Sequence, residues 1–441
     1  MKKILFLLFG LFTVTAYAQE AEALKEYFLK TLQGEDATPP SEKVLIKKID
    51  KTRAEVWEAW KEANEAFEED RLPELDSLSR APVGSWPLPE NLEPDAVMPF
   101  YYGCKGDKPQ EGYPLFIYLH GSGDKEHEWA NGLTFGNRFA DSPSVYFIPQ
   151  IPNEGEWYRW WQQSKQYAWD RLLRQTLLKD YINPNKLYVF GISEGGYGSQ
   201  RLASYYADYW AAAGPMAGGE PLKNAPAENL MHTPFLLRTG AEDKGFYRDI
   251  LSRYTRDALD SLVNLNPIGF RHRVDLIPGM GHHIDYDVTT PWLNHFTRTM
   301  NPKEFIWEDF EMDGVHRKGF YNLLVDQRPD SLLRTRYDFI IGDSNVVNII
   351  IEDVHYQTIQ KDAQFGIEMK FERTYTPAEG GKLTVFLDED MVDLTSWVKI
   401  RINGRQLFFG KLRPNVKDMA KSLATFYDPE RIFPVSVEIE Y

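Results

Sequence analysis

The sequence contains a single cysteine, Cys104, so no disulfide can form within one chain and the fold must rest on core packing. It also has no excess of positive charge, because 50 Lys and Arg stand against 65 Asp and Glu and leave a formal net charge of −15. Without a basic surface to neutralise phosphates, nucleic acids and anionic membranes are poor partners. The chain of 441 residues, 43% of them hydrophobic, has enough apolar material for two or three folded units.

Long hydrophobic runs are missing except at the N-terminus. There, Lys2 and Lys3 precede an apolar run over residues 4–14 that is too short to span a bilayer, and Ala16-Tyr17-Ala18 is a small-x-small cleavage site. This pattern predicts a signal peptide at residues 1–18, cleaved after Ala18, with a membrane anchor as the alternative. We therefore expect an exported protein, periplasmic or secreted, that keeps no membrane anchor after cleavage.

An acidic, helix-rich segment follows at residues 19–85. Val56, Trp60, Ala63 and Phe67 recur at spacings of four, three and four, which places them on one face of a helix. We expect this stripe to pack on the main domain, and the alternative is a cap over the active site.

Two further domains are predicted from the change in pattern along the chain. Over residues 86–301 short apolar runs such as "YPLFIYLHG" alternate with helical stretches, which predicts a mostly parallel sheet covered by helices on both faces. Over residues 302–441 strand-like runs dominate, and "RINGRQ" carries an Asn-Gly turn typical of a hairpin. We expect a C-terminal β-rich, sandwich-like domain.

The stretch "GISEGG" carries a Gly-x-Ser-x-Gly motif around Ser193. It follows a predicted strand and precedes a predicted helix, and this context favours a serine nucleophile on a sharp turn. The alternative is a structural serine in an ordinary strand-to-helix turn.

A serine nucleophile needs a base and an acid that orients the base. Later strand ends supply Asp243 in "TGAED" and His282 in "GMGHH", in the order Ser, acid, His. Glu242 is the rival acid and His283 the rival base. A metal site is the other interpretation of the histidine pair, but no third ligand at an ordered spacing supports it. We predict a triad of Ser193, Asp243 and His282, and this chemistry requires neither a metal nor a cofactor.

The oxyanion of the tetrahedral intermediate needs two backbone N–H donors. One comes from Glu194, the residue after the nucleophile, and the other from the loop "HGSGD", where Ser122 is the candidate. We expect the Glu194 carboxylate to turn away from the oxyanion and pair with a donor beneath the turn. His120, at the start of this loop, is interpreted as structural.

The loop "EGEWYRWWQQ" is rich in aromatic residues near the carboxyl edge of the sheet. Trp157, Trp160 and Trp161 are candidates for stacking on a sugar ring or an aromatic acyl group. The alternative is that most of them pack in the core or within the loop.

Together, the motifs HGSGD, GISEGG, GAED and GMGHH in this order resemble the α/β-hydrolase superfamily over residues 95–300. The nearest groups are secreted bacterial esterases of the polyhydroxybutyrate-depolymerase, feruloyl-esterase and dienelactone-hydrolase type. The resemblance implies the α/β-hydrolase fold and an acyl-serine intermediate. It does not imply which ester is the substrate, or what the C-terminal domain does.

Three functions from different classes remain open at this point. The first is a serine hydrolase that cleaves carboxylic esters, with acyl groups on polysaccharides or another small-molecule ester as substrate. The second is a serine exopeptidase of the prolyl-oligopeptidase type, although the N-terminal segment is too small for that branch's large extra domain. The third is a non-catalytic carbohydrate-binding protein with a relic site.

Overall fold

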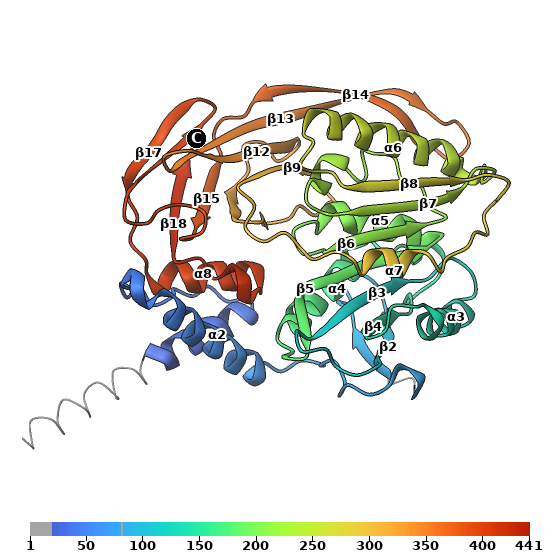
Figure 1. Cartoon of the computed structure of the whole chain (residues 1–441), viewed down its shortest axis with the longest axis horizontal. Coiled ribbons are helices and arrows are strands. Elements are labelled where there is room, and N and C mark those ends of the chain that lie inside the picture. Colours follow the sequence, from blue (N-terminus) through green and yellow to red (C-terminus); the bar gives the residue numbers. More distant parts are fainter. Residues whose placement is uncertain (1–19, 81–82) are drawn as a thin grey trace, which may run out of the picture.

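The computed structural model describes residues 20–80 and 83–441, so the predicted signal peptide and its cleavage site lie outside the described residues. Among the helices of the described ranges, none has the length and apolar character needed to cross a membrane. Figure 1 shows two parts that each contain β-sheet, and the N-terminal helices lie beside the C-terminal part.

An eight-stranded sheet forms the centre of the first part, in the order β1-β2-β4-β3-β5-β6-β7-β8. Its strands are β1 (Val83–Pro87), β2 (Val97–Lys105), β3 (Tyr113–Leu119), β4 (Ser144–Pro149), β5 (Ile182–Ile192), β6 (Ala212–Met216), β7 (Phe235–Gly240) and β8 (His272–Ile277). Strand β2 runs antiparallel to both of its neighbours, and the strands from β4 to β8 are parallel. This topology confirms the predicted α/β-hydrolase fold. The sheet begins at Val83, three residues before the expected boundary at 86.

Helices cover both faces of this sheet (Figure 1). They are α3 (Lys125–Arg138), α4 (Gln163–Leu177), α5 (Glu194–Tyr205), α6 (Arg248–Leu265) and α7 (Thr289–Leu293). Strand β3 explains why two layers are needed, because all of its residues are buried. Ile117 packs in one core with Trp169 of α4, while Phe116 packs in a second core with Leu293 of α7. Successive side chains of a strand point to opposite faces, so each face requires its own cover.

The C-terminal domain is built from two sheets that share one core. One sheet has the order β10-β11-β15-β18, and the other has the order β17-β16-β13-β12-β9, with β14 paired to β13. The strands are β9 (Glu304–Asp309), β10 (Gly319–Phe320), β11 (Leu323–Gln327), β12 (Arg334–Gly342), β13 (Val346–Lys361), β14 (Glu368–Pro377), β15 (Lys382–Leu387), β16 (Trp397–Ile402), β17 (Arg405–Lys411) and β18 (Val435–Glu440). Residues of both sheets, such as Tyr337 and Val385, lie in a single buried cluster. The predicted β-rich, sandwich-like domain is therefore confirmed.

The N-terminal helices pack mainly on this C-terminal domain. Residues 20–32 are helical, and α2 (Ile49–Ala66) follows. Trp60 of α2 is fully buried in the C-terminal core and stacks on Tyr427, just after α8 (Val416–Phe426), with 5.9 Å between ring centroids. The expectation that the helical stripe packs on the hydrolase domain is wrong. The amphipathic pattern identified the buried face, but a pattern carries no information about the partner.

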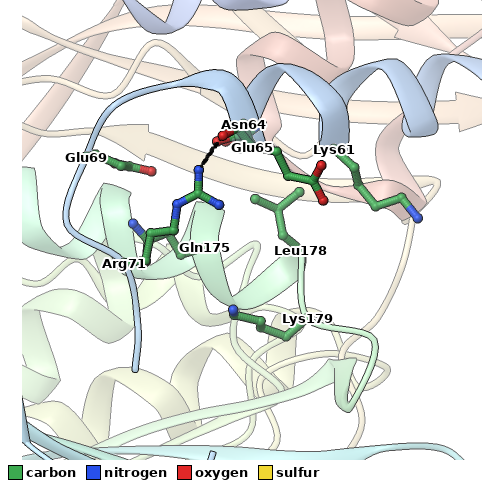
Figure 2. A pocket seen from close by; sticks show the side chains of 8 residues that line it. All are labelled: Lys61, Asn64, Glu65, Glu69, Arg71, Gln175, Leu178 and Lys179. Carbon is green, nitrogen blue, oxygen red and sulfur yellow. Dashed lines mark hydrogen bonds between the residues drawn. The ribbon is translucent and has the colours of Figure 1, made fainter. Parts of the chain in front are cut away.

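A small pocket of about 130 Å³ marks the place where α2 meets α4 (Figure 2). Arg71, in the segment after α2, donates a hydrogen bond from Nη2 to the carbonyl of Asn64 at 3.0 Å, and Gln175 of α4 donates from Nε2 to the carbonyl of Asp70 in the same segment at 2.9 Å. Polar side chains such as Glu69 and Gln175 line the pocket, and none of the predicted catalytic residues is among its lining. It belongs to the contact between the two helices.

Buried ion pairs also join the two domains. Asp428, in the C-terminal domain, accepts hydrogen bonds from Arg298 at 2.7 Å and from Arg431 at 2.8 Å. Arg431 reaches across to Asp208 of the hydrolase domain at 2.6 Å, and Arg317 pairs with Asp208 as well. Because these charges are almost completely buried, the two domains are tied by contacts that are costly to break singly.

Candidate active site

Ser193 lies at the end of β5, directly before α5. Its φ angle of +57° is in a region that non-glycine residues rarely adopt, as expected for a nucleophile raised above a sheet on a sharp turn. Gly195 permits the turn, because a Cβ atom there would lie 1.9 Å from the carbonyl oxygen of Leu119. The backbone N–H of Ser193 donates to the carbonyl of Met216 at 2.9 Å and holds the strained residue in place.

The structure brings the three predicted triad side chains together. Nε2 of His282 lies 2.9 Å from Oγ of Ser193, and Nδ1 of His282 lies 2.7 Å from Oδ2 of Asp243. The three residues follow β5, β7 and β8, whose carboxyl ends meet at one edge of the parallel sheet. This geometry lets His282 accept the serine proton while Asp243 holds the imidazole in the required tautomer.

The two rival residues lie outside this hydrogen-bonded chain. Glu242 is exposed, whereas Asp243 is buried with 3% exposure. His283 is also exposed, with its ring centroid 6.1 Å from that of His282. Both pairs lie in the turns that follow β7 and β8, and only one residue of each pair points into the hydrogen-bonded chain.

Arg248, at the start of α6, is a member of the site that the sequence did not reveal. Its Nε donates to Oδ2 of Asp243 at 2.9 Å, and its Nη1 donates to the hydroxyl of Tyr197 at 3.1 Å. It is 8% exposed, so the ion pair with Asp243 is shielded from solvent. No motif marks an arginine five residues after the acid, because its contact depends on the turn that leads into α6.

The loops that carry Asp243 and His282 also contact each other. A Cβ on Gly240 would lie 2.0 Å from the carbonyl oxygen of Gly281, and the N–H of Glu242 donates to the carbonyl of Met280 at 2.9 Å. Only a glycine allows this approach, which fixes the acid and the base relative to each other.

The candidate oxyanion donors lie on both sides of the serine. The N–H of Glu194 is the first of α5 and therefore has no carbonyl partner within the helix. On the other side, a Cβ on Gly121 would lie 3.4 Å from Cβ of Ser193, so the loop with Ser122 is next to the nucleophile. Glu128 of α3 packs against this loop, because a Cβ on Gly123 would lie 3.0 Å from its Oε1. The second donor remains the predicted Ser122 amide.

The carboxyl group of Glu194 is 9% exposed and is poorly paired. Its Oε1 lies 3.5 Å from Nη1 of Arg159 and has no hydrogen-bond partner. Burial raises the pKa of Glu194 to about 7, because the attraction of Arg159 does not offset the loss of hydration and Glu220 adds repulsion. We expected the Glu194 carboxylate to pair with a donor beneath the turn, but the cation nearest to it is Arg159 of the aromatic loop.

The aromatic loop divides into buried and accessible residues. Trp160 is fully buried, and its Nε1 donates to the carbonyl of His120 at 3.0 Å, so the prediction that it contacts substrate is wrong. Tryptophan has a large apolar surface, and here that surface fills the space beneath the loop. Trp157 is half-buried, and a lysine lies over its ring. Trp161 is also half-buried and lines the pocket next to Ser193.

His120 is structural, as expected. It is completely buried, and its Nε2 accepts a hydrogen bond from the N–H of Ile151 at 3.1 Å. Burial lowers the pKa of His120 to about 4, so the ring is neutral and holds the loop through its other nitrogen. Within residues 20–80 and 83–441, no cluster of three or more His, Cys, Asp or Glu side chains is arranged to hold a metal ion.

Comparisons with known proteins found solved structures that resemble part of this chain, several of them esterases. No protein-family model and no curated protein matches the sequence. A thermostable esterase is similar in structure at 19% identity and a TM-score of 0.40, covering 50% of this chain and 64% of that esterase. The poly(3-hydroxybutyrate) depolymerase LpqC from Bordetella parapertussis is similar at 14% identity and a TM-score of 0.36, covering 50% of this chain and 88% of that one. A ferulic acid esterase from the anaerobic fungus Anaeromyces mucronatus is similar at 14% identity and a TM-score of 0.34, covering 49% and 88%. These TM-scores are low, so the likenesses carry no conclusion about the substrate.

Proposed function

We propose that this protein is a serine hydrolase that cleaves carboxylic esters through an acyl-serine intermediate. The observation that carries the proposal is the continuous hydrogen-bonded chain from Ser193 Oγ through His282 to Asp243. A serine hydroxyl is a weak nucleophile, and this arrangement is the one that activates it.

In the first half-reaction, Ser193 Oγ attacks the ester carbonyl while its proton passes to Nε2 of His282. The negative charge that develops on the carbonyl oxygen would be stabilised by the N–H groups of Glu194 and Ser122. When the tetrahedral intermediate collapses, the bond to the alcohol oxygen breaks and His282 gives its proton to the departing alcohol.

In the second half-reaction, a water molecule gives a proton to His282 and attacks the acyl-serine carbonyl. The acid is released, and the proton returns from His282 to Ser193 Oγ. We propose a neutral ester as substrate, for example an acyl group on a polysaccharide, because Glu194, directly after the nucleophile, is negatively charged above its pKa of about 7 and then disfavours strongly anionic substrates. Export from the cell, as the N-terminal sequence predicts, is consistent with such a substrate.

Hydrolysis of p-nitrophenyl acetate by the wild type and by Ser193→Ala tests the proposal. We expect the substitution to lower kcat on the order of a million-fold, as for the nucleophile of other serine hydrolases. Ser261→Ala, at an exposed position of α6, is the matched control and should keep the full rate. Equal rates for Ser193→Ala and the wild type would refute the proposal.

Two further measurements separate the other candidate functions. Faster turnover of a dipeptidyl p-nitroanilide than of the ester would favour an exopeptidase. Failure of a fluorophosphonate probe to label Ser193 would favour a binding protein with a relic site.

A further inference from the structure

A pocket of about 590 Å³ lies between the hydrolase domain and the C-terminal domain. On the hydrolase side it is lined by Glu194 and Tyr197 of α5 and by Trp161 of the aromatic loop. It therefore begins at the residue directly after the nucleophile. Its opposite wall comes from residues 365–367, which lie between β13 and β14, and from Glu368, the first residue of β14. In Figure 1, β14 runs along the outside of the hydrolase domain past α6, which brings this turn to the active-site side.

The turn between β13 and β14 is well defined. Asp362 accepts a hydrogen bond from the N–H of Phe365 at 2.5 Å, and the carbonyl of Asp362 accepts one from the N–H of Gly366 at 3.1 Å. Gly366 has a φ angle of +69°, which a glycine adopts without strain. The turn thus holds Phe365 in one position at the rim of the pocket.

This turn contacts the segment that links the catalytic acid to α6. The ring of Phe365 lies 4.6 Å from that of Phe246 between centroids, and the hydroxyl of Tyr247 donates to Asp362 at 2.7 Å. Phe246 and Tyr247 both have positive φ angles, +50° and +59°. Such a conformation costs free energy in a bulky residue and persists where surrounding contacts hold it. The C-terminal domain therefore supports a strained loop of the active site as well as forming a wall.

The lining of the pocket is charged and balanced. Besides Arg159 and Glu194, three ion pairs line it: Arg201–Glu220, Lys223–Glu368 and Arg334–Glu311. Four cations and four carboxylates leave no net charge for an ionic ligand once Glu194, whose pKa is about 7, has lost its proton. The guanidinium of Arg201 also lies 3.8 Å from the ring centroid of Trp161. Paired charges offer both donors and acceptors around a neutral ligand, and the rings of Trp161, Phe246 and Phe365 add apolar surface.

Given the proposed ester hydrolysis at Ser193, we propose that the β13–β14 turn of the C-terminal domain completes the pocket that receives the alcohol part of the ester, and that this part is neutral and rich in hydroxyl groups. A hydroxyl group both donates and accepts, so it can bind between the members of the ion pairs without disturbing their charge balance. A purely apolar alcohol would displace water from these ion pairs without offering a donor or acceptor in its place, and a charged alcohol would meet no net attraction.

Two acetate esters that differ only in the alcohol test this proposal. They are 6-O-acetylglucose and p-nitrophenyl acetate, measured with the wild type and with Phe365→Ala. We expect Phe365→Ala to lower the ratio of kcat/KM for the sugar ester to that for p-nitrophenyl acetate about tenfold, mainly through KM. Phe365 is 46% exposed, so its loss leaves the core intact, and an unchanged Tm would verify this. Ile359→Ala is the matched control, because Ile359 is 52% exposed on β13 and is not part of the pocket.

An unchanged ratio in Phe365→Ala, or an equal fall in Ile359→Ala, would overturn the proposal. A binding measurement tests the proposed alcohol pocket separately from the proposed ester hydrolysis. We expect 6-O-acetylglucose to quench the tryptophan fluorescence of Ser193→Ala and to bind about tenfold more weakly when Phe365→Ala is added. If the wild type hydrolysed neither ester, the proposed function would fail, whereas binding that depends on Phe365 would still support the pocket. Absence of binding to Ser193→Ala would reject the pocket.

Discussion

Arg248 and Asp243 form an ion pair through the same carboxylate oxygen that faces the imidazole of His282. Oδ2 of Asp243 lies 2.9 Å from Nε of Arg248 and 2.7 Å from Nδ1 of His282. The arginine thereby fixes the carboxylate at the angle that the imidazole needs. It does not contact the reacting atoms, so it is a positioning residue.

Replacing this arginine should reduce catalysis without abolishing it. We expect Arg248→Met to lower kcat about ten- to a hundredfold, because a small displacement of Asp243 is transmitted to His282. Steady-state kinetics on p-nitrophenyl acetate and the rate of fluorophosphonate labelling measure the effect, and a shifted pH profile would distinguish positioning from a loss of folded protein. Arg253→Met is the control, since Arg253 lies on the same helix but pairs with Asp249. Equal rates for the two variants would contradict the positioning role.

The neighbouring histidines should differ sharply in their contribution. His282→Ala removes the base and should lower kcat on the order of a million-fold. His283 is exposed and has no contact with Ser193 or Asp243 in the described residues, so His283→Ala should stay within about twofold of the wild type. Initial rates of p-nitrophenyl acetate hydrolysis decide between the two, and the reverse result would assign the base to His283.

Glu194 should make stability fall as the pH rises toward neutrality. The pKa of its carboxyl group is about 7 in the folded protein, raised by burial from 4.5. Between pH 4.5 and about 7, the carboxyl group is therefore protonated in the folded state and ionised in the unfolded state. The free energy of unfolding declines as the pH rises through this range. We expect Glu194→Gln to be about 1–3 kcal/mol more stable than the wild type at pH 8 and to lose this advantage below pH 4.5. Urea unfolding at several pH values measures the difference, and a pH-independent difference would refute the assignment.

The buried ion pairs between the domains should be essential for stability. Burial alone would raise the pKa of Asp428, but Arg298 and Arg431 outweigh it and the pKa is lowered. A lowered pKa means that this stabilisation is present above the ordinary pKa of an aspartate and is lost as the pH falls through the folded value. Asp428→Asn leaves two buried arginines undercompensated and should cost about 3–5 kcal/mol of unfolding free energy.

Glu430→Gln is the control for this substitution, because Glu430 is exposed two residues away. Chemical denaturation of both variants gives the comparison. Equal stability of Asp428→Asn and Glu430→Gln would show that the network does not hold the domains together.

Most of the candidate site could be predicted from the sequence, because its elements are local. The Gly-x-Ser-x-Gly turn, the acid after β7 and the histidine after β8 each follow a recognisable strand, and parallel strands bring their carboxyl ends to one edge. Arg248 could not be predicted, since its contact with Asp243 depends on two left-handed residues, Phe246 and Tyr247, that no sequence pattern announces.

The two sequence predictions that were wrong concern which surfaces pack against each other. Trp160 and Trp161 are adjacent and chemically identical, yet one is fully buried and the other lines the pocket, because consecutive side chains of a loop point in different directions. Likewise, the stripe around Trp60 was correctly expected to be buried, but its partner is a helix more than 350 residues later in the chain. Long-range pairing of this kind depends on the shape of both surfaces and not on the periodicity of either.

The shared core of α2 and α8 has a consequence for the order in which the protein can assemble. The hydrolase sheet is made entirely from residues 83–277, so its strands are all present once that part of the chain has been synthesised. The N-terminal helices precede this sheet in the chain, but they pack against residues of β15, α8 and β18. Their apolar faces therefore stay uncovered until those later segments have been synthesised. The contact between the N-terminal helices and these C-terminal segments closes a very long loop of chain, which costs conformational entropy. It should therefore form last. The earliest part of the described chain is thus among the last to become native, and during that interval Trp60 and its neighbours form an exposed apolar surface that a chaperone could bind.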